Sequence, residues 1–200
     1  MPVLLTAVVG ANFGDEGKGL VTDYVATQSK KTTLVVRFNG GAQAGHTVET
    51  PCGLRHVFRH MGSGSFTGAS TCLSRFFIVD PLIFKQEHQT LLELGLAPRC
   101  YVDARARVAT PYDVAINRIL EDERGDAKHG SCGLGIGETV ERCLSPEYSL
   151  TVSDLMDRPG LVKKLKAIHH EWLPWRLKQL NITSLSNHWK QVFALDLFWK

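Results

Sequence analysis

Several features are missing from this sequence of 200 residues, and each absence argues against a class of protein. Lysine and arginine are scattered along the chain, and without basic runs the sequence shows no sign of binding nucleic acid. No stretch approaches the roughly 18 uninterrupted apolar residues of a membrane span, and "MPVLLTAVVGAN" lacks the basic start of a signal peptide. We therefore expect a cytoplasmic protein that binds neither nucleic acid nor membranes.

The cysteines lack any recognisable arrangement. The five cysteines form no C-x-x-C pair, and their spacings suit neither a disulfide framework nor a zinc site, which favours a reducing compartment. Internal repeats and low-complexity segments are absent too. With 44% hydrophobic and 22% charged residues, the composition is that of an ordinary globular protein, and we expect residues 1–200 to form a single domain.

What the sequence does contain is an alternation of apolar runs with glycine loops and helix signals. Residues 3–9 form an almost continuous apolar run, as expected for a strand buried on both faces of a parallel sheet, and apolar residues at helical spacing follow at 20–25. Further strands are indicated at 34–38 and 76–79, and further helices from Asp80–Pro81, Thr110–Pro111 and Pro159 onward. We expect an α/β fold with a mainly parallel central sheet flanked by helices, whose ligands bind at the loops that follow the strands.

The first glycine loop, "GANFGDEGKGL", precedes the expected helix at 20–25. Gly14, Gly17 and Gly19 allow the backbone to approach an anion closely, and Lys18 adds a positive charge. Its acidic residues, Asp15 and Glu16, allow two interpretations. They complement the dipole of the following helix, or Asp15 acts as a magnesium ligand or as a base beside bound phosphates.

The second loop, "FNGGAQAGHTV", carries the side-chain amide of Gln43 and the imidazole of His46. An isolated histidine is often only a surface residue. Here Gly45 permits close approach of the backbone, and a histidine, whose pKa is normally about 6.5, is suited to act as a general acid. From the residues alone, both a surface role and a catalytic role stay open.

The third loop, "HGSCGLGIGET", combines several glycines with Ser131 and Cys132. Its N–H groups and the serine hydroxyl are enough to bind a monophosphate, although the glycines are equally consistent with flexibility alone. Cys132 has no strong cation near it in the sequence, and we interpret it as an inert thiol rather than a nucleophile.

Together these three loops resemble those of the adenylosuccinate synthetase family. "GDEGKG" at 14–19 resembles the phosphate loop of that family, "NGGAQAGHTV" at 39–48 resembles its GGxNAGHT loop, and "HGSCGLGIGET" at 129–139 resembles its GTTGRGIGP loop. The resemblance covers roughly residues 3–172 and leaves 173–200 unassigned. It implies a P-loop-NTPase-like fold that is incomplete, because the later elements of the family are not in this sequence.

The family joins inosine monophosphate (IMP) to L-aspartate with GTP and Mg²⁺, by way of a purine phosphorylated on O6. By resemblance, Asp15 takes the N1 proton of the base and binds Mg²⁺ together with the carbonyl of Gly45. His46 acts as an acid toward the transferring phosphoryl group, and Lys18 contacts phosphate. Further implied nucleotide or phosphate contacts are Gly14, Glu16, Gly17, Gly19, Gln43, Ala44, Thr47, Ser131, Cys132 and Arg142. The resemblance places the Arg142 contact across a homodimer interface.

The loops also depart from the family pattern. Gln43 stands where the family has asparagine, Cys132 where it has threonine and Leu134 where it has arginine. Two functions therefore stay open: a ligase of this family, including one for another purine nucleotide, and a non-catalytic truncated homologue. The homologue would bind a nucleotide, or another protein through the apolar end "FALDLFWK". A fragment of a longer protein would have the same sequence.

Overall fold

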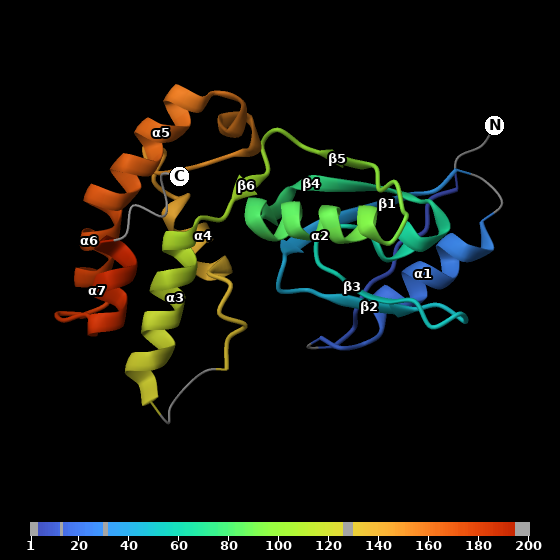
Figure 1. Ribbon diagram of the computed structural model, residues 1–200, viewed down its shortest axis with the longest axis horizontal. Coiled ribbons are helices and arrows are strands. Elements are labelled where there is room, and N and C mark those ends of the chain that lie inside the picture. Colours follow the sequence, from blue (N-terminus) through green and yellow to red (C-terminus); the bar gives the residue numbers. More distant parts are fainter. Residues whose placement is uncertain (1–3, 13, 30–31, 126–129, 195–200) are drawn as a thin grey trace. The chain divides into compact units, whose positions relative to one another are not determined.

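The computed structural model describes residues 4–12, 14–29, 32–125 and 130–194 (Figure 1). The chain divides into two compact units, the first comprising Met1–Phe77 with Pro81–Asp103 and the second Ile78–Asp80 with Ala104–Lys200. None of the described helices is both long and apolar enough to cross a membrane. The expectation of a single domain stays a prediction.

The first unit is built on β1 (Leu34–Gly41), β4 (Ser70–Val79) and β5 (Cys100–Val102), which lie side by side in that order. β4 and β5 are parallel, with Leu73 opposite Val102. The other elements are α1 (Lys18–Gln28), α2 (Pro81–Glu93), the antiparallel hairpin of β2 (His46–Glu49) and β3 (Arg55–Phe58), and a 3₁₀-helix at Ser63–Thr67. The buried core of this unit contains Val48, Phe58, Met61 and Leu91.

The second unit is mostly helical. The end of β4 pairs in parallel with β6 (Arg107–Val108). The helices are α3 (Pro111–Arg124), α4 (Ile136–Arg142), α5 (Arg158–Ala167), α6 (Leu173–Gln179) and α7 (Asn187–Ala194), with a 3₁₀-helix at Val152–Met156 and a π-helical turn at Ile168–Trp172. The core contains Val108, Tyr112, Ile116, Leu150, Ile168, Trp172 and Leu173. The predicted α/β fold with a mainly parallel sheet is confirmed.

Several predicted elements are confirmed because their signals are local. β1 and β4 contain the strands predicted at 34–38 and 76–79, and α2, α3 and α5 begin at or beside the predicted prolines. At the start of α3, the Thr110 hydroxyl accepts the Asp113 N–H at 3.4 Å, and the Asp113 carboxylate accepts the Thr110 N–H at 2.8 Å. This capping box pairs the Thr110 N–H and gives the Asp113 N–H, which also donates to the Thr110 carbonyl at 3.0 Å, a second acceptor.

The strand predicted at 3–9 is wrong for the part of it that the structure describes. Residues 4–9 form no strand, and Leu4, Leu5 and Val9 are 90%, 88% and 82% exposed. A strand is held by hydrogen bonds to a neighbouring strand, and none of the described strands pairs with these residues. The apolar run therefore lacks the neighbour that the prediction assumed.

A buried ion pair joins α3 and α4. Arg142 donates from Nε and Nη2 to the Asp113 carboxylate, both at 2.8 Å, and to the carbonyls of Val108 at 2.8 Å and Tyr148 at 2.5 Å. The carboxylate also accepts the Thr139 hydroxyl at 3.1 Å. Neither charged side chain is exposed. All three guanidinium nitrogens of Arg142 are therefore engaged within the core.

Removing Arg142 should destabilise the second unit. Arg142→Met leaves Asp113 as a buried carboxylate without its counter-ion, and breaking a buried pair from one side costs about 3–5 kcal/mol. Urea unfolding followed by tryptophan fluorescence should show this loss in the free energy of unfolding. Arg124→Met removes a part-exposed pair with Glu121 and should cost about 1 kcal/mol or less. Equal losses in the two variants would contradict the prediction.

Candidate functional site

The first loop enters α1 through a series of left-handed backbone conformations. Gly14, Asp15 and Gly17 have φ angles of 124°, 54° and 79°, a region that glycine adopts freely and that aspartate tolerates better than most residues. Gly17 is the N-cap of α1 and makes no side-chain cap. The N–H groups at the start of α1 therefore face the loop without a capping acceptor, which favours an anion there.

The carboxylate of Glu16 lies in this loop as an internal anion. Oε1 accepts the N–H groups of Asn12 at 2.9 Å and Gly14 at 3.4 Å, and Oε2 pairs with Nζ of Lys18. The contact with Lys18, followed by that with Asn12, lowers the pKa of Glu16 to about 2. A Cβ on Gly10 would lie 2.6 Å from Oε1 of Glu16 and 2.7 Å from Nζ of Lys18, so this pair packs closely against Gly10. The loop is thus shaped around a negative charge.

The second loop is held by a buried arginine of β1 that sequence patterns did not single out. Arg37 donates to the carbonyls of Ala44 at 2.8 Å and Arg59 at 2.5 Å, and its guanidinium lies 5.0 Å from the ring centroid of Phe77. Arg59 in turn donates to the carbonyl of Ala42 at 3.0 Å. A charged residue inside the apolar run "LVVRF" is the signal that could have indicated this role. These contacts fix the backbone at Ala42 and Ala44.

The first and second loops meet where α1 begins. A Cβ on Gly19 would lie 2.6 Å from Cβ of His46, so only glycine allows His46 to pack against α1. Burial, followed by the nearby positive charges of Arg37 and Lys18, lowers the pKa of His46 to about 4. At neutral pH His46 is therefore uncharged in the ligand-free protein, with one ring nitrogen as a donor and the other as an acceptor.

The remaining predicted residues of the first two loops differ in exposure. Asp15, Gly45 and Thr47 are exposed. Oε1 of Gln43 is buried and accepts no hydrogen bond from the described residues. A buried acceptor of this kind normally has a partner, and a donor group of a ligand would provide one.

Whether these loops suit magnesium can be judged from the donors they present. The part of the chain that the structure describes contains no group of three or more His, Cys, Asp or Glu side chains arranged to hold a metal ion. Mg²⁺ in phosphate-transfer sites is usually held by one or two carboxylates together with phosphate oxygens and waters. The exposed carboxylate of Asp15 and the exposed backbone at Gly45 fit such a site, in which bound phosphates supply further ligands.

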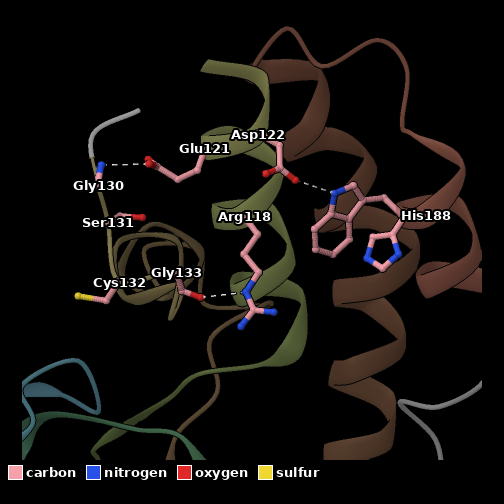
Figure 2. A pocket seen from close by; sticks show the side chains of 9 residues that line it. Arg118, Glu121, Asp122, Gly130, Ser131, Cys132, Gly133 and His188 are labelled. Atoms are coloured by element: carbon pink, nitrogen blue, oxygen red, sulfur yellow. Dashed lines mark hydrogen bonds between the residues drawn. The ribbon is translucent and has the colours of Figure 1, made fainter. Parts of the chain in front are cut away.

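The third loop belongs to the second unit and borders an open pocket of about 450 Å³ beside α3 (Figure 2). The pocket is lined by Arg118, Glu121, Asp122, Gly130, Ser131, Cys132, Gly133, His188 and Trp189. Nε of Arg118 donates to the carbonyl of Gly133 at 3.4 Å, and the Gly130 N–H donates to Glu121 at 3.2 Å, as the dashed lines in Figure 2 show. His129, the first residue of the predicted motif, lies outside the described residues.

Two residues of α3 that sequence patterns did not indicate support the third loop. The Asn117 amide donates to the Ser131 hydroxyl at 3.2 Å and accepts the Gly135 N–H at 3.3 Å. A Cβ on Gly135 would lie 2.5 Å from the carbonyl carbon of Asp113, so the loop packs directly on the α3 backbone. Arg118 brings a positive charge to the pocket that Cys132 also lines. The sequence showed no such cation because it comes from α3 rather than from the loop.

The Arg142 side chain contributes neither to the site of the first two loops nor to the pocket beside the third loop. Its side chain is fully buried and donates to Asp113 and to two backbone carbonyls. The structure therefore contradicts the implied contact of Arg142 with a nucleotide across a dimer interface, because no part of the guanidinium reaches solvent. The homodimer itself stays a prediction.

Comparisons with known proteins agree on one family. A family model described as adenylosuccinate synthetase matches residues 7–194, and so extends beyond residue 172, where the resemblance drawn from the sequence ends. The adenylosuccinate synthetase of Mycobacterium avium (strain 104) is 34% identical over 169 residues, which are 84% of this chain and 38% of that protein. The enzyme of the same name from Borrelia duttonii (strain Ly) is 32% identical over 160 residues, which are 80% of this chain and 36% of that protein.

Two solved structures share the fold. The fully ligated adenylosuccinate synthetase of Plasmodium falciparum matches with a TM-score of 0.66 and 21% identity, over 92% of this chain and 42% of that one. The succinoaminodeoxyadenylate synthetase of cyanophage S-2L, bound to dGMP and dATP, matches with a TM-score of 0.51 and 20% identity, over 74% of this chain and 41% of that one. At these identities the likeness concerns the fold alone.

The chain spans well under half the length of the curated relatives it matches, namely 36% and 38% of the two described. The matched range of the family model nevertheless includes all three glycine loops. With a family match over residues 7–194 and 34% identity to a curated relative, the chain belongs to the adenylosuccinate synthetase family.

Proposed function

We propose that this chain takes part in a GTP- and Mg²⁺-dependent ligase reaction that joins IMP to L-aspartate. The observation that carries the proposal is the contact of Gly19 with His46, because it sets the first loop, with Lys18, beside the imidazole. Relatives at 32–34% identity are adenylosuccinate synthetases, which supports the same reaction here.

The chemistry of the first two loops suits phosphoryl transfer to the purine O6. Asp15 takes the N1 proton of the base, since its carboxylate is exposed and accepts no hydrogen bond within the described residues. Lys18 binds a phosphate. Bound Mg²⁺ supplies positive charge that stabilises the phosphates, and Asp15 and the carbonyl of Gly45 would hold it.

His46 acts first as a neutral hydrogen-bond donor. Its pKa of about 4 means that the imidazole carries no proton to release from a charged form at neutral pH. Its one N–H still donates to a phosphoryl oxygen. A bound phosphate adds negative charge beside the ring, which raises the pKa of His46 and favours the protonated acid that the resemblance implies.

The third loop is proposed to bind the monophosphate of the purine nucleotide. Ser131, Cys132 and the loop N–H groups line the open pocket with the exposed guanidinium of Arg118. A guanidinium binds phosphate through charge-assisted hydrogen bonds. Arg118 then supplies the positive charge that Leu134 does not.

A second candidate function, binding without catalysis, is favoured by exposed apolar residues in the first unit. Leu34, Val36 and Phe38 of β1 are 52%, 51% and 62% exposed, and the ring of Phe38 lies 5.1 Å from that of Phe76. Contiguous exposed apolar residues often mark a contact with another protein segment. The apolar end "FALDLFWK" lies mostly outside the described residues.

Calorimetry combined with a coupled assay separates the two candidates. IMP and GTP would each be titrated into the chain with and without Mg²⁺, and adenylosuccinate and phosphate would then be measured with aspartate present. The ligase requires both binding and product. Nucleotide binding by folded protein without product from any purine pair, including dGMP with dATP, would leave the binding function alone.

Asp15→Asn and His46→Asn should each lower kcat by at least about 100-fold, because a positioned proton-transfer group typically contributes that much. Asp15 lies in an exposed loop and His46 is the half-buried first residue of β2, so circular dichroism of both variants must show an unchanged fold. Asp23→Asn on α1 makes the same substitution outside the loops and serves as the control. Unchanged rates in the two loop variants would remove Asp15 and His46 from their assigned roles.

The His46 imidazole should titrate near pH 4 rather than 6.5 in the ligand-free chain. Because the folded pKa lies below the unfolded one, the stability linked to neutral His46 is present above about pH 6.5 and is lost as pH falls toward 4. NMR titration of the ring should show the low midpoint, and Lys18→Met should raise it by removing a positive charge. If Lys18→Met left the titration midpoint of His46 unchanged, this electrostatic account would be contradicted.

Arg118→Met should weaken IMP binding by on the order of tenfold, because it removes a charge-assisted hydrogen bond to the monophosphate. GTP binding should not change. Calorimetry of the variant, with Arg158→Met on α5 as an exposed control, measures both affinities. Equal IMP affinity in wild type and Arg118→Met would place the monophosphate elsewhere.

A further inference from the structure

Glu16 engages the same groups of the first loop that a phosphate would need. Its carboxylate accepts the N–H groups of Asn12 and Gly14 and pairs with the ammonium of Lys18. The resemblance assigned Glu16 to the ligand contacts, but a carboxylate and a phosphate are both anions and acceptors. They compete for donors rather than bind each other.

We propose that Glu16 is an internal competitor of the ligand phosphate: its carboxylate occupies the anion position of the first loop in the ligand-free protein, and a bound phosphate displaces it. This inference concerns how the site is regulated, and its functional meaning rests on the proposed nucleotide-binding function. Displacement lowers the affinity of every phosphate that enters the loop by the same factor.

The geometry of the loop supports displacement rather than a fixed internal contact. The side chains of Lys18 and Glu16 are 39% and 18% exposed, and Gly14, Asp15 and Gly17 between and beside them are exposed as well. Glu16 therefore has a path from the loop to water. The Lys18 ammonium is freed by the same movement and becomes available to the phosphate.

Because the factor by which displacement lowers affinity is common to all phosphates, competition leaves their relative affinities unchanged and, at a given concentration, reduces the occupancy of weakly bound anions most. A free phosphate ion offers the loop little more than the Glu16 carboxylate already does. A nucleotide that also contacts other parts of the protein gains enough additional binding to displace Glu16. The loop is then kept from small anions while it stays available to the nucleotide.

The test compares inorganic phosphate binding by wild type, Glu16→Gln and Glu16→Ala. The amide signals of Asn12 and Gly14 in ¹⁵N NMR spectra report the loop directly during a phosphate titration. We expect both variants to bind phosphate on the order of tenfold more tightly than wild type, which corresponds to losing one competing charge-assisted contact. GTP with Mg²⁺ should gain by a similar factor. Glu49→Gln, an exposed carboxylate on β2, is the control for a change in net charge and should leave the affinity unchanged.

The outcomes separate this inference from the proposed function. Phosphate affinity in the Glu16 variants that is equal to or weaker than wild type overturns the inference, even if GTP still binds, and would make Glu16 a support of the loop. Tighter phosphate binding at Asn12 and Gly14 sustains it, even if the wild type forms no adenylosuccinate. If neither phosphate nor nucleotide shifted the amide signals of Asn12 and Gly14 in any variant, both the inference and the proposed function would be overturned.

Discussion

The contact between α1 and the second loop is the constraint on which the candidate site depends. A Cβ on Gly19 would lie 2.6 Å from the Cβ of His46, so the start of the helix and the start of β2 touch through a position that tolerates no side chain. Lys18 immediately precedes this contact in the sequence, and His46 forms its other side. The spatial relation of the two residues therefore follows from backbone packing and not from any direct bond between their side chains. Arg37 further fixes the position of His46, because it donates a hydrogen bond to the carbonyl of Ala44, two residues earlier in the second loop.

The charges around this contact are coupled to whatever occupies the first loop. Lys18 and Arg37 both lower the pKa of His46, and Glu16 pairs with one of the two cations. A phosphate in the loop would take over the pairing with Lys18 and would bring negative charge toward the ring. The protonation of His46 then becomes a consequence of ligand binding, because the same cation interacts with the histidine and the anion. Acid chemistry at His46 would in this way be available only when its phosphate partner is present.

Much of the fold could be predicted from signals between residues that are close in the sequence. Contacts between residues that are far apart in the sequence could not be predicted in this way. The capping box of Thr110 and Asp113 lies within four residues, so the start of α3 could be predicted. The Asp113 carboxylate that caps α3 also binds Arg142, 29 residues away, and no local pattern indicates that pairing. The resemblance implies a ligand contact for Arg142, whereas in the structure its guanidinium is part of the core. The strand predicted at 3–9 is wrong for a related reason, since an apolar run forms a strand only if another strand lies beside it.

The chemistry of the third loop depends on α3 as well as on the residues of the loop itself. Judged by the loop alone, Leu134 removes a positive charge and Cys132 removes a hydroxyl, and both changes argue against binding an anion. The structure places the loop directly on the α3 backbone through Gly135, which brings the guanidinium of Arg118 into the pocket and the Asn117 amide to the Ser131 hydroxyl. Charge and hydrogen-bonding capacity are thus supplied by the neighbouring helix. Because an anion responds to the field at its position and not to the segment that carries the charge, the changes within the loop do not by themselves argue against a phosphate site there.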